Sequence, residues 1–181
     1  MYGIVNLAIQ GLVVENHGLD KWNKIKEKSG VKVPFFLSDE PYDDEITFNL
    51  VACSSEVLNI PQSEILKAFG EYWVLKTGQE KYGELMKAGG KDFSEFITNL
   101  PNFHSRIMLI YPKLSPPEFK VSRKDDKTLI LDYYSTRKGL TYFVIGLIEG
   151  IAKMFNTEIK MTHLSSNSDG NWHDTFEIYI L

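Results

Sequence analysis

The sequence predicts an α+β fold in which a helical first half is followed by an antiparallel sheet. Three observations support this prediction. Apolar residues recur at helical spacing up to residue 111, two hairpin patterns follow, and one amphipathic helix separates the hairpins. Helices first, and then strand–strand–helix–strand–strand, is typical of a domain with a four-stranded antiparallel sheet.

Each helix of the first half is supported by an apolar period and by residues that begin or end it. His17-Gly18 ends the first helix, Gly30 ends the second, and Pro61 opens the fourth, since proline is tolerated in a first turn. Pro101 interrupts the last period and predicts a helix that is kinked or split in two. We therefore expect helices over 2–16, 19–29, 45–58, 62–76, 79–88 and 91–111.

The second half alternates between apolar and polar residues and contains turn signals. Strands are expected over 118–123 and 127–134, and over 157–164 and 174–181. Lys124-Asp125-Asp126 would turn the first hairpin and Asp169-Gly170 the second. A helix over 138–155 would connect the hairpins.

Composition limits the classes of protein. The 181 residues, 43% of them apolar, are enough for one domain with a sizeable core. The net charge of −4 argues against nucleic acid as a partner, and the single Cys53 fits a reducing compartment. The most apolar stretch, 142–154, is too short to span a bilayer, and the N-terminus lacks the basic start of a signal peptide. We expect a cytoplasmic protein that neither enters a membrane nor binds nucleic acid.

The most informative residues are Tyr133, Ser135 and Arg137, which form a Tyr-x-Ser-x-Arg run. On one strand, residues i, i+2 and i+4 point to the same face, so the run would present three hydrogen-bond donors side by side. Such a row suits a ligand with two neighbouring carboxylates, as in the propionates of haem. The same pattern also occurs at an ordinary sheet edge.

A haem also needs an axial ligand, and the four histidines differ as candidates. His17 ends a helix, His163 lies near the end of a strand, and His173 is expected in a polar turn. His104 alone lies on an apolar helical face. A single histidine on such a face is more often a core residue than a metal ligand, so His104 alone decides nothing.

Taken together, the order and spacing of these residues resemble the haem–nitric oxide/oxygen-binding (H-NOX) family, which includes the haem domain of soluble guanylate cyclase. The resemblance runs almost end to end. Its motifs are Met1-Tyr2-Gly3, Ala68-Phe69-Gly70-Glu71-Tyr72-Trp73, Asn102-Phe103-His104, Pro116-Pro117-x-Phe119, Tyr133-Tyr134-Ser135-Thr136-Arg137 and Gly146-Leu147-Ile148-Glu149-Gly150. The family implies b-type haem between a helical lobe, residues 1–60, and a lobe with the sheet, residues 61–181.

The resemblance assigns roles to residues on one side of the haem. His104 resembles the proximal iron ligand, and Tyr133, Ser135 and Arg137 resemble the propionate clamp. Pro117 matches a proline that packs on the macrocycle and helps to bend it. The glycines at 146 and 150 would either contact the haem or allow close helix packing.

On the opposite, distal side the resemblance implies a wall formed by Val5, Trp73, Phe143 and Leu147. Oxygen-binding members carry a tyrosine at the position of Phe143, which has no hydroxyl. Tyr142 is adjacent, but a one-residue shift turns a side chain by about 100° on a helix and places it off the pocket. Trp73 either packs against the ligand or donates its indole N–H.

The resemblance predicts a gas sensor for nitric oxide and carbon monoxide rather than an enzyme. No sequence remains for an output domain, so we expect signalling in trans, as in bacterial relatives whose partner is a histidine kinase or a cyclic-di-GMP enzyme. The alternatives are an oxygen sensor, a haem enzyme of peroxidase type and a haem-free α+β binding domain. The acidic run 39–45 lacks the order of an EF-hand and is expected to be an exposed loop before a helix.

Overall fold

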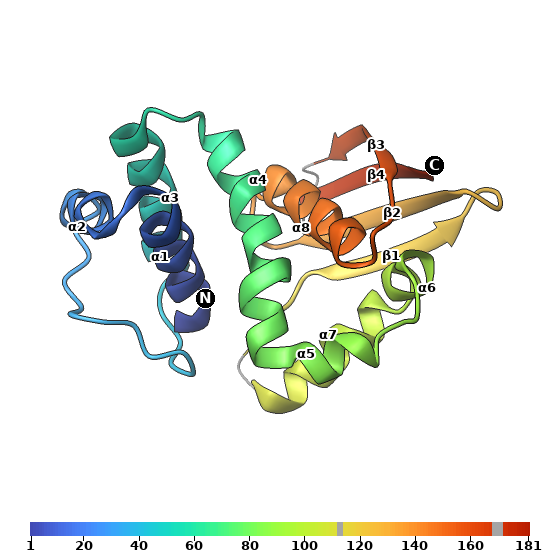
Figure 1. The fold of residues 1–181 in the computed structure, drawn as a ribbon, viewed down its shortest axis with the longest axis horizontal. Helices are drawn as coiled ribbons and strands as arrows, with labels where there is room; N and C mark the ends of the chain where they lie inside the picture. The colour runs from blue at the N-terminus through green and yellow to red at the C-terminus, as the bar shows by residue number, and fades with distance from the viewer. Residues whose placement is uncertain (112–113, 168–171) are drawn as a thin grey trace.

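The computed structural model describes residues 1–111, 114–167 and 172–181. It shows helices followed by a four-stranded antiparallel sheet, which confirms the α+β prediction (Figure 1). The helices are α1 (Gly3–His17), α2 (Leu19–Lys28), α3 (Asp44–Leu58), α4 (Gln62–Tyr72), the π-helical turn η1 (Trp73–Gly78), α5 (Gln79–Lys87), α6 (Phe93–Thr98), α7 (Leu100–Ile110) and α8 (Thr141–Met154). The strands are β1 (Glu118–Arg123), β2 (Thr128–Ser135), β3 (Ile159–Asn167) and β4 (Trp172–Ile180).

The sheet has the strand order β1-β2-β4-β3, so the two hairpins join through the β2–β4 pair. In the register, Phe119 lies opposite Tyr133 and Tyr133 lies opposite Asp174. Side chains of β2 alternate between buried and half-buried, because the inner face packs on α8 and the outer face does not. Figure 1 shows α8 lying across the sheet, with α6 and α7 beside β1.

Two hydrophobic cores flank α4. Ile9 and Leu50 belong to the core of the α1–α3 group, whereas Phe176 belongs to the core between α8 and the sheet. The segment α4–η1 supplies Phe69 to the first core and Val74 to the second. In Figure 1, α4 accordingly stands between the α1–α3 group and the sheet layer.

The structure refines three local predictions. The helix predicted over 91–111 is split at Asn99, and Pro101 falls in the first turn of α7, where its missing N–H costs no helical bond. The helix predicted over 62–76 continues through η1 into α5. His173 does not lie in a turn but in β4, paired with Tyr134 of β2, so that prediction was wrong. The turn predicted at Asp169-Gly170 lies outside the described residues.

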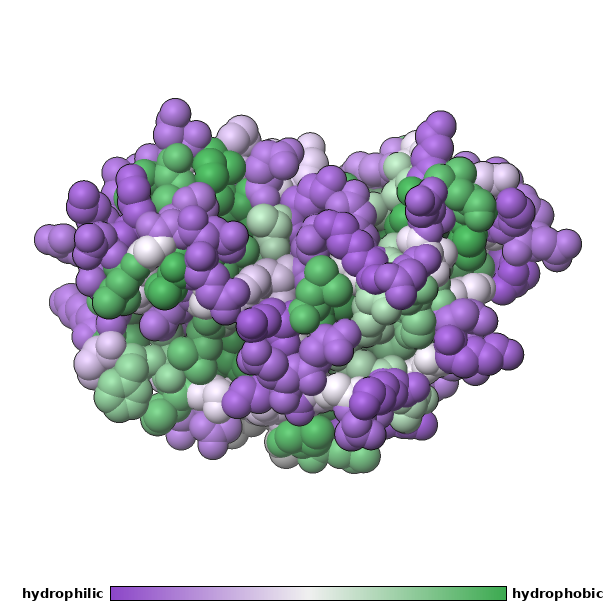
Figure 2. All heavy atoms as spheres, in the orientation of Figure 1, coloured by the Kyte–Doolittle hydropathy of each residue, from purple (hydrophilic) through white to green (hydrophobic). Residues whose placement is uncertain are grey.

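The surface is mostly polar. Figure 2 shows charged and polar side chains over most of one face, with apolar groups scattered between them. The most exposed large apolar side chain is Leu109, which lies at the end of α7 between the exposed residues Met108 and Ile110. Within the described ranges, every helix is too short or too polar to cross a membrane.

Candidate functional site

A cavity of about 240 Å³ lies between the α1–α3 group, α4, α8 and the inner face of the sheet. Apolar side chains form most of its lining. Most of the polar exceptions lie on the side formed by α7, by β2 with Arg137 beyond it, and by the segment 114–117, whereas Thr47 and Tyr82 come from α3 and α5. This uneven distribution divides the cavity into a ligand wall, which carries those polar groups, and an apolar wall opposite it.

His104 projects from α7 into the ligand wall. Its ring stacks on buried Phe119, with ring centroids 5.3 Å apart and planes within 5°. Its Nδ1 is buried and has no hydrogen-bond partner in the described part of the chain, and a buried polar atom without a partner requires an explanation. Burial lowers the pKa of the imidazole to about 4. The ring is therefore neutral at pH 7, which is the form that binds a metal.

Tyr133 and Ser135 lie next to this imidazole, on the inner face of β2. Both are buried and both line the cavity, and the Tyr133 ring packs against Phe119 with centroids 5.3 Å apart. Burial raises the pKa of the Tyr133 phenol, so the hydroxyl stays protonated and can donate a hydrogen bond. Two of the three predicted donors thus share one strand face, as expected.

Arg137 lies beyond the end of β2, so the prediction that it shares the strand was wrong. Its backbone N–H donates to Ser135 Oγ at 3.0 Å, which bends the chain back toward the cavity. Its Nε donates to Asp44 Oδ2 at 2.6 Å and its Nη1 donates to the carbonyl of Ser115 at 2.9 Å. The guanidinium lines the cavity, but it also joins the sheet layer to the first residue of α3.

Asp44 is a residue beside the site that sequence reasoning missed, because the acidic run 39–45 was expected to be an exposed loop before a helix. Its carboxylate accepts from Arg137 and also pairs with the Met1 ammonium. Burial opposes its ionisation, but hydrogen bonds from these two cations outweigh burial and lower its pKa. Since its arginine partner lies 93 residues away, no local sequence pattern could have revealed the pair.

Pro117 also lines the ligand wall, immediately before β1 and two residues from Phe119. Its fixed φ makes this part of the wall rigid. At the other end of the wall, Tyr111 closes α7 and contacts two further phenols. Its ring meets Tyr2 edge-on at 4.8 Å and its hydroxyl accepts from Tyr82 at 2.7 Å. The helix that carries His104 is therefore connected to the α1–α3 group.

The apolar wall contains the four residues predicted for it, Val5, Trp73, Phe143 and Leu147. Phe69 joins them, with its ring centroid 4.7 Å from that of Phe143 and 6.5 Å from that of Trp73. Trp73 begins the π-helical turn η1, and π-turns often occur at functional sites. Its indole N–H makes no hydrogen bond within the described residues.

Tyr142 lies outside the cavity. Its side chain is 48% exposed, and it does not belong to the lining, whereas the next residue, Phe143, does. The prediction that Tyr142 lies off the pocket therefore agrees with the geometry. The wall that faces His104 contains no hydroxyl group among the residues predicted for it.

Glycines fix α8, and thus the apolar wall, against α4. A methyl group at Gly146 would lie 2.0 Å from the carbonyl oxygen of Lys67, and one at Gly70 would lie 2.2 Å from that of Phe143. Gly150 is less tight, with 3.0 Å to Val74. Gly146 and Gly150 therefore serve close packing of α8 on α4.

The residues present fit a haem. The apolar cavity suits a flat apolar ring, the neutral imidazole suits an iron, and the neighbouring hydrogen-bond donors suit two carboxylates. Arg137 has five N–H donors, and Asp44 and Ser115 use three of them, so two are available for a propionate. Among the described residues, no three His, Cys, Asp or Glu side chains gather closely enough to hold a bare metal ion.

Comparisons with known proteins agree with this geometry. The family model described as "Haem-NO-binding" matches residues 2–163. Soluble guanylate cyclase gcy-31 of Caenorhabditis elegans is 27% identical over 172 residues, which cover 94% of this chain and 24% of that protein. The chain thus spans about a quarter of the length of this relative.

Solved structures show the same fold. An H-NOX protein from S. oneidensis in the Fe(II)NO state superposes with a TM-score of 0.89 at 23% identity, covering 100% of this chain and 99% of that one. An oxygen-binding H-NOX domain related to soluble guanylate cyclases, in its oxygen complex, gives 0.83 at 21% identity, covering 99% and 95%.

Proposed function

Because the chain belongs to the haem–NO-binding (H-NOX) family, whose domains bind haem and sense gases, we propose that it senses nitric oxide at a ferrous haem b. His104 is the iron ligand in this proposal, Tyr133, Ser135 and Arg137 bind the propionates, and Pro117 packs on the macrocycle. The observation that carries the proposal is the neutral imidazole of His104, whose Nδ1 is buried without a hydrogen-bond partner among the described residues, beside an apolar cavity.

The apolar wall supports selectivity for nitric oxide over oxygen. Bound oxygen is polar and gains from a hydrogen-bond donor, and one neutral hydrogen bond contributes about 0.5–1.5 kcal/mol. Phe143 occupies the position where oxygen-binding relatives place a tyrosine, and the Tyr142 hydroxyl lies outside. Nitric oxide and carbon monoxide need no such donor, so we expect both to bind.

An oxygen sensor is the second candidate, and one observation favours it. The indole of Trp73 lines the cavity and has no hydrogen-bond partner among the described residues, so its N–H is available to a ligand. Replacing Trp73 with Phe would remove this donor while keeping the ring. If the wild-type protein forms a stable oxygen complex and Trp73→Phe loses it, the second candidate replaces the first.

The contacts around His104 suggest how ligand binding is transmitted. A bound haem would be held by His104 and would supply the iron that binds nitric oxide. A change in the position of His104 would move α7, and the Tyr111–Tyr2 contact would carry that shift to the α1–α3 group. The Arg137–Asp44 pair also joins the sheet layer to α3, so a rotation of the α1–α3 group would change it. The energy for this change is the difference in ligand affinity between the two arrangements.

The output of the sensor lies in a separate chain in our proposal, either a histidine kinase or a cyclic-di-GMP enzyme. Mixing the haem-loaded protein with such a partner, and measuring the partner's activity with and without nitric oxide, tests this step. A partner whose activity is the same in both states would contradict signalling by this route, without affecting haem binding.

Haemin titration tests the assignment of His104. We expect the wild-type protein and His17→Ala, in which an exposed histidine is removed, to take up one haem each with the same Soret maximum. His104→Ala should lose that spectrum and bind haem at least about tenfold more weakly, because the axial bond is gone. If His104→Ala kept the wild-type spectrum and affinity, His104 would not be the ligand.

A further inference from the structure

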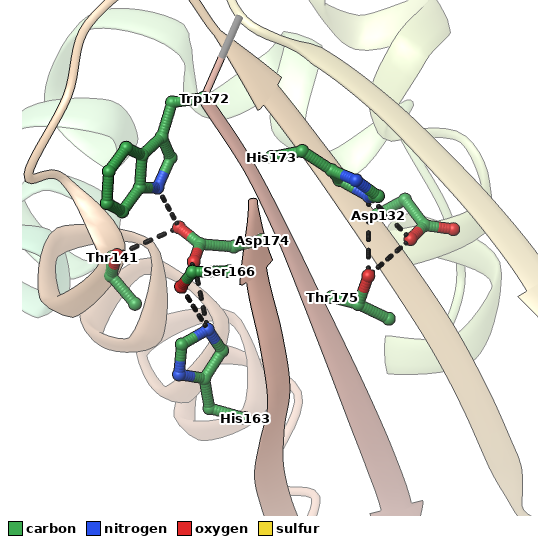
Figure 3. A network of polar contacts seen from close by, with 8 residues as sticks. All are labelled: Asp132, Thr141, His163, Ser166, Trp172, His173, Asp174 and Thr175. Carbon is green, nitrogen blue, oxygen red and sulfur yellow. Dashed lines mark hydrogen bonds and ion pairs between the residues drawn. The ribbon is translucent and has the colours of Figure 1, made fainter. Parts of the chain in front are cut away.

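A second polar cluster lies on the inner face of the sheet, away from His104, and centres on Asp174 of β4 (Figure 3). The Asp174 side chain is fully buried. One carboxylate oxygen, Oδ2, accepts from Thr141 Oγ1 at 2.8 Å and from Trp172 Nε1 at 2.7 Å. The other, Oδ1, accepts from Ser166 Oγ and lies 2.9 Å from His163 Nε2. The carboxylate therefore has four partners, which come from α8, β3 and β4.

This cluster does not have the geometry of a nucleophilic triad, although it contains serine, histidine and aspartate. In a triad the acid holds one imidazole nitrogen and the nucleophile contacts the other. Here His163 Nε2 contacts both Asp174 and Ser166, and the Ser166 hydroxyl donates directly to the carboxylate. The serine is thus not activated, and the cluster holds structural elements together.

The element that Asp174 holds is the first turn of α8. Thr141 is the first residue of that helix, and Leu140 before it provides no side-chain cap. A buried carboxylate at a helix N-terminus is also favoured by the helix dipole. The glycine contacts with α4 hold α8 at the Phe143 carbonyl, which lies against Gly70, and at Gly146, so the bond between Thr141 and Asp174 adds an anchor at the first residue of the helix.

That first turn contains both Tyr142 and Phe143, of which only Phe143 lines the cavity. Neighbouring residues on a helix point about 100° apart. A first turn that unwinds or rotates can therefore move the phenol of Tyr142 into the cavity and the phenyl ring of Phe143 out of it. Gly139, with φ of +80°, lies in the link just before this turn, and its conformational freedom would not oppose such a change.

We propose that Asp174, acting through Thr141, is a positioning residue for gas selectivity that keeps Phe143 in the apolar wall and Tyr142 outside it. The proposal rests on the proposed function for its gas readout. Its structural half concerns this chain alone and holds with or without haem.

The test compares Thr141→Val with Thr175→Val. Both changes replace a threonine with a side chain of the same shape, and both remove a 2.8 Å hydrogen bond to an aspartate. Thr175 and its partner Asp132 lie on the outer face of the sheet, on the other side of β4 (Figure 3). Thr141→Ser keeps the hydroxyl and should behave as the wild-type protein does.

Hydrogen exchange followed by mass spectrometry on the haem-free proteins provides the first readout. We expect Thr141→Val to lose amide protection over residues 141–145, and Thr175→Val to leave protection there unchanged. Equal protection of this turn in the wild-type protein and Thr141→Val would overturn the proposal, and this result is independent of whether the protein binds haem.

Oxygen affinity of the reduced, haem-loaded proteins provides the second readout. Thr141→Val should raise oxygen affinity by roughly two- to tenfold, the range that one neutral hydrogen bond supplies, and adding Tyr142→Phe should abolish the gain. A gain that persists in the double variant would overturn the role given to Tyr142. Failure of the wild-type protein to bind haem would refute the proposed function but leave the exchange result to decide the anchoring.

Discussion

The two walls of the cavity differ in what they present to a ligand. The ligand wall carries His104, Tyr133, Ser135 and Arg137, which in our proposal bind the iron and the propionates of a haem. The apolar wall carries Phe143, which has no polar group, and Trp73, whose indole N–H is the side-chain donor that the oxygen-sensor alternative depends on. In our proposal the first wall binds the haem and the second sets the choice of gas.

The walls also differ in how they are held. The ligand wall is built from neighbouring strands, β1 and β2, together with α7. In the apolar wall, Phe143 and Leu147 come from α8, which is fixed by glycine contacts with α4 and by the bond between Thr141 and Asp174. Changes to the ligand wall should therefore alter haem affinity, whereas changes to α8 should alter stability and selectivity.

Removing the charge from the ligand wall should have the largest effect. Arg137→Gln removes charge-assisted hydrogen bonds, each worth about 1.5–3 kcal/mol, so we expect haem to dissociate roughly ten- to a hundredfold faster. Transfer of haem to apomyoglobin, followed by absorbance, measures that rate. Arg123→Gln, at an exposed position on the edge strand β1, is the control and should dissociate haem at the wild-type rate.

Adding a methyl group between α4 and α8 should have the second-largest effect. Gly146→Ala places a carbon 2.0 Å from a backbone oxygen, which must shift, and such overpacking destabilises a fold by about 1–3 kcal/mol. Urea unfolding measures the change. Gly83→Ala in α5 is the matched control, because nothing lies within 4 Å of the added carbon, and we expect no loss of stability. Equal stability of the two variants would contradict the packing role of Gly146.

A hydroxyl group placed in the apolar wall should shift the gas selectivity of the haem-loaded protein toward oxygen. Phe143→Tyr adds a donor at a position that lines the cavity, so oxygen affinity should rise by about two- to tenfold. Tyr142→Phe is the converse change and should leave oxygen affinity as it is, since Tyr142 lies outside. Oxygen titration of the reduced proteins distinguishes these outcomes.

The contact between Asp44 and Arg137 should give the smallest effect, and one that depends on pH. The folded protein lowers the pKa of Asp44 below its ordinary value of 3.8, so the pair stabilises the fold above about pH 4 and loses its effect as the pH falls through the folded pKa. Because the carboxylate is 37% exposed, the contribution is screened and should stay below about 1 kcal/mol.

Unfolding curves between pH 7 and pH 3 test this expectation. The stability difference between the wild-type protein and Asp44→Asn should be present at pH 7 and should shrink as the pH falls below about 4. Asp39→Asn, an exposed acid of the same run, should match the wild-type protein throughout. A difference that grew as the pH fell would contradict the sign of the shift.

Sequence reasoning located the ligand wall better than the contacts that hold it. The helical face of His104 and the alternation of Tyr133 and Ser135 are local periodicities, which a short stretch of chain reveals. Two other contacts join distant segments, namely the Arg137–Asp44 pair and the contact of Gly146 with Lys67. No local sequence pattern indicates either contact. His173 was misplaced because its polar neighbours resemble a turn, whereas in β4 His173 and Thr175 lie on the outer face of the sheet and Asp174 is buried on the inner face.

One measurement tests the difference between the walls most directly, namely the absorbance spectrum of the purified, reduced, haem-loaded protein before and after exposure to nitric oxide and, separately, to air. The structure predicts a Soret band that shifts with nitric oxide and shows no stable oxygen complex in air. A stable six-coordinate oxygen spectrum would contradict the account, because it would require a working donor in the wall that carries Phe143.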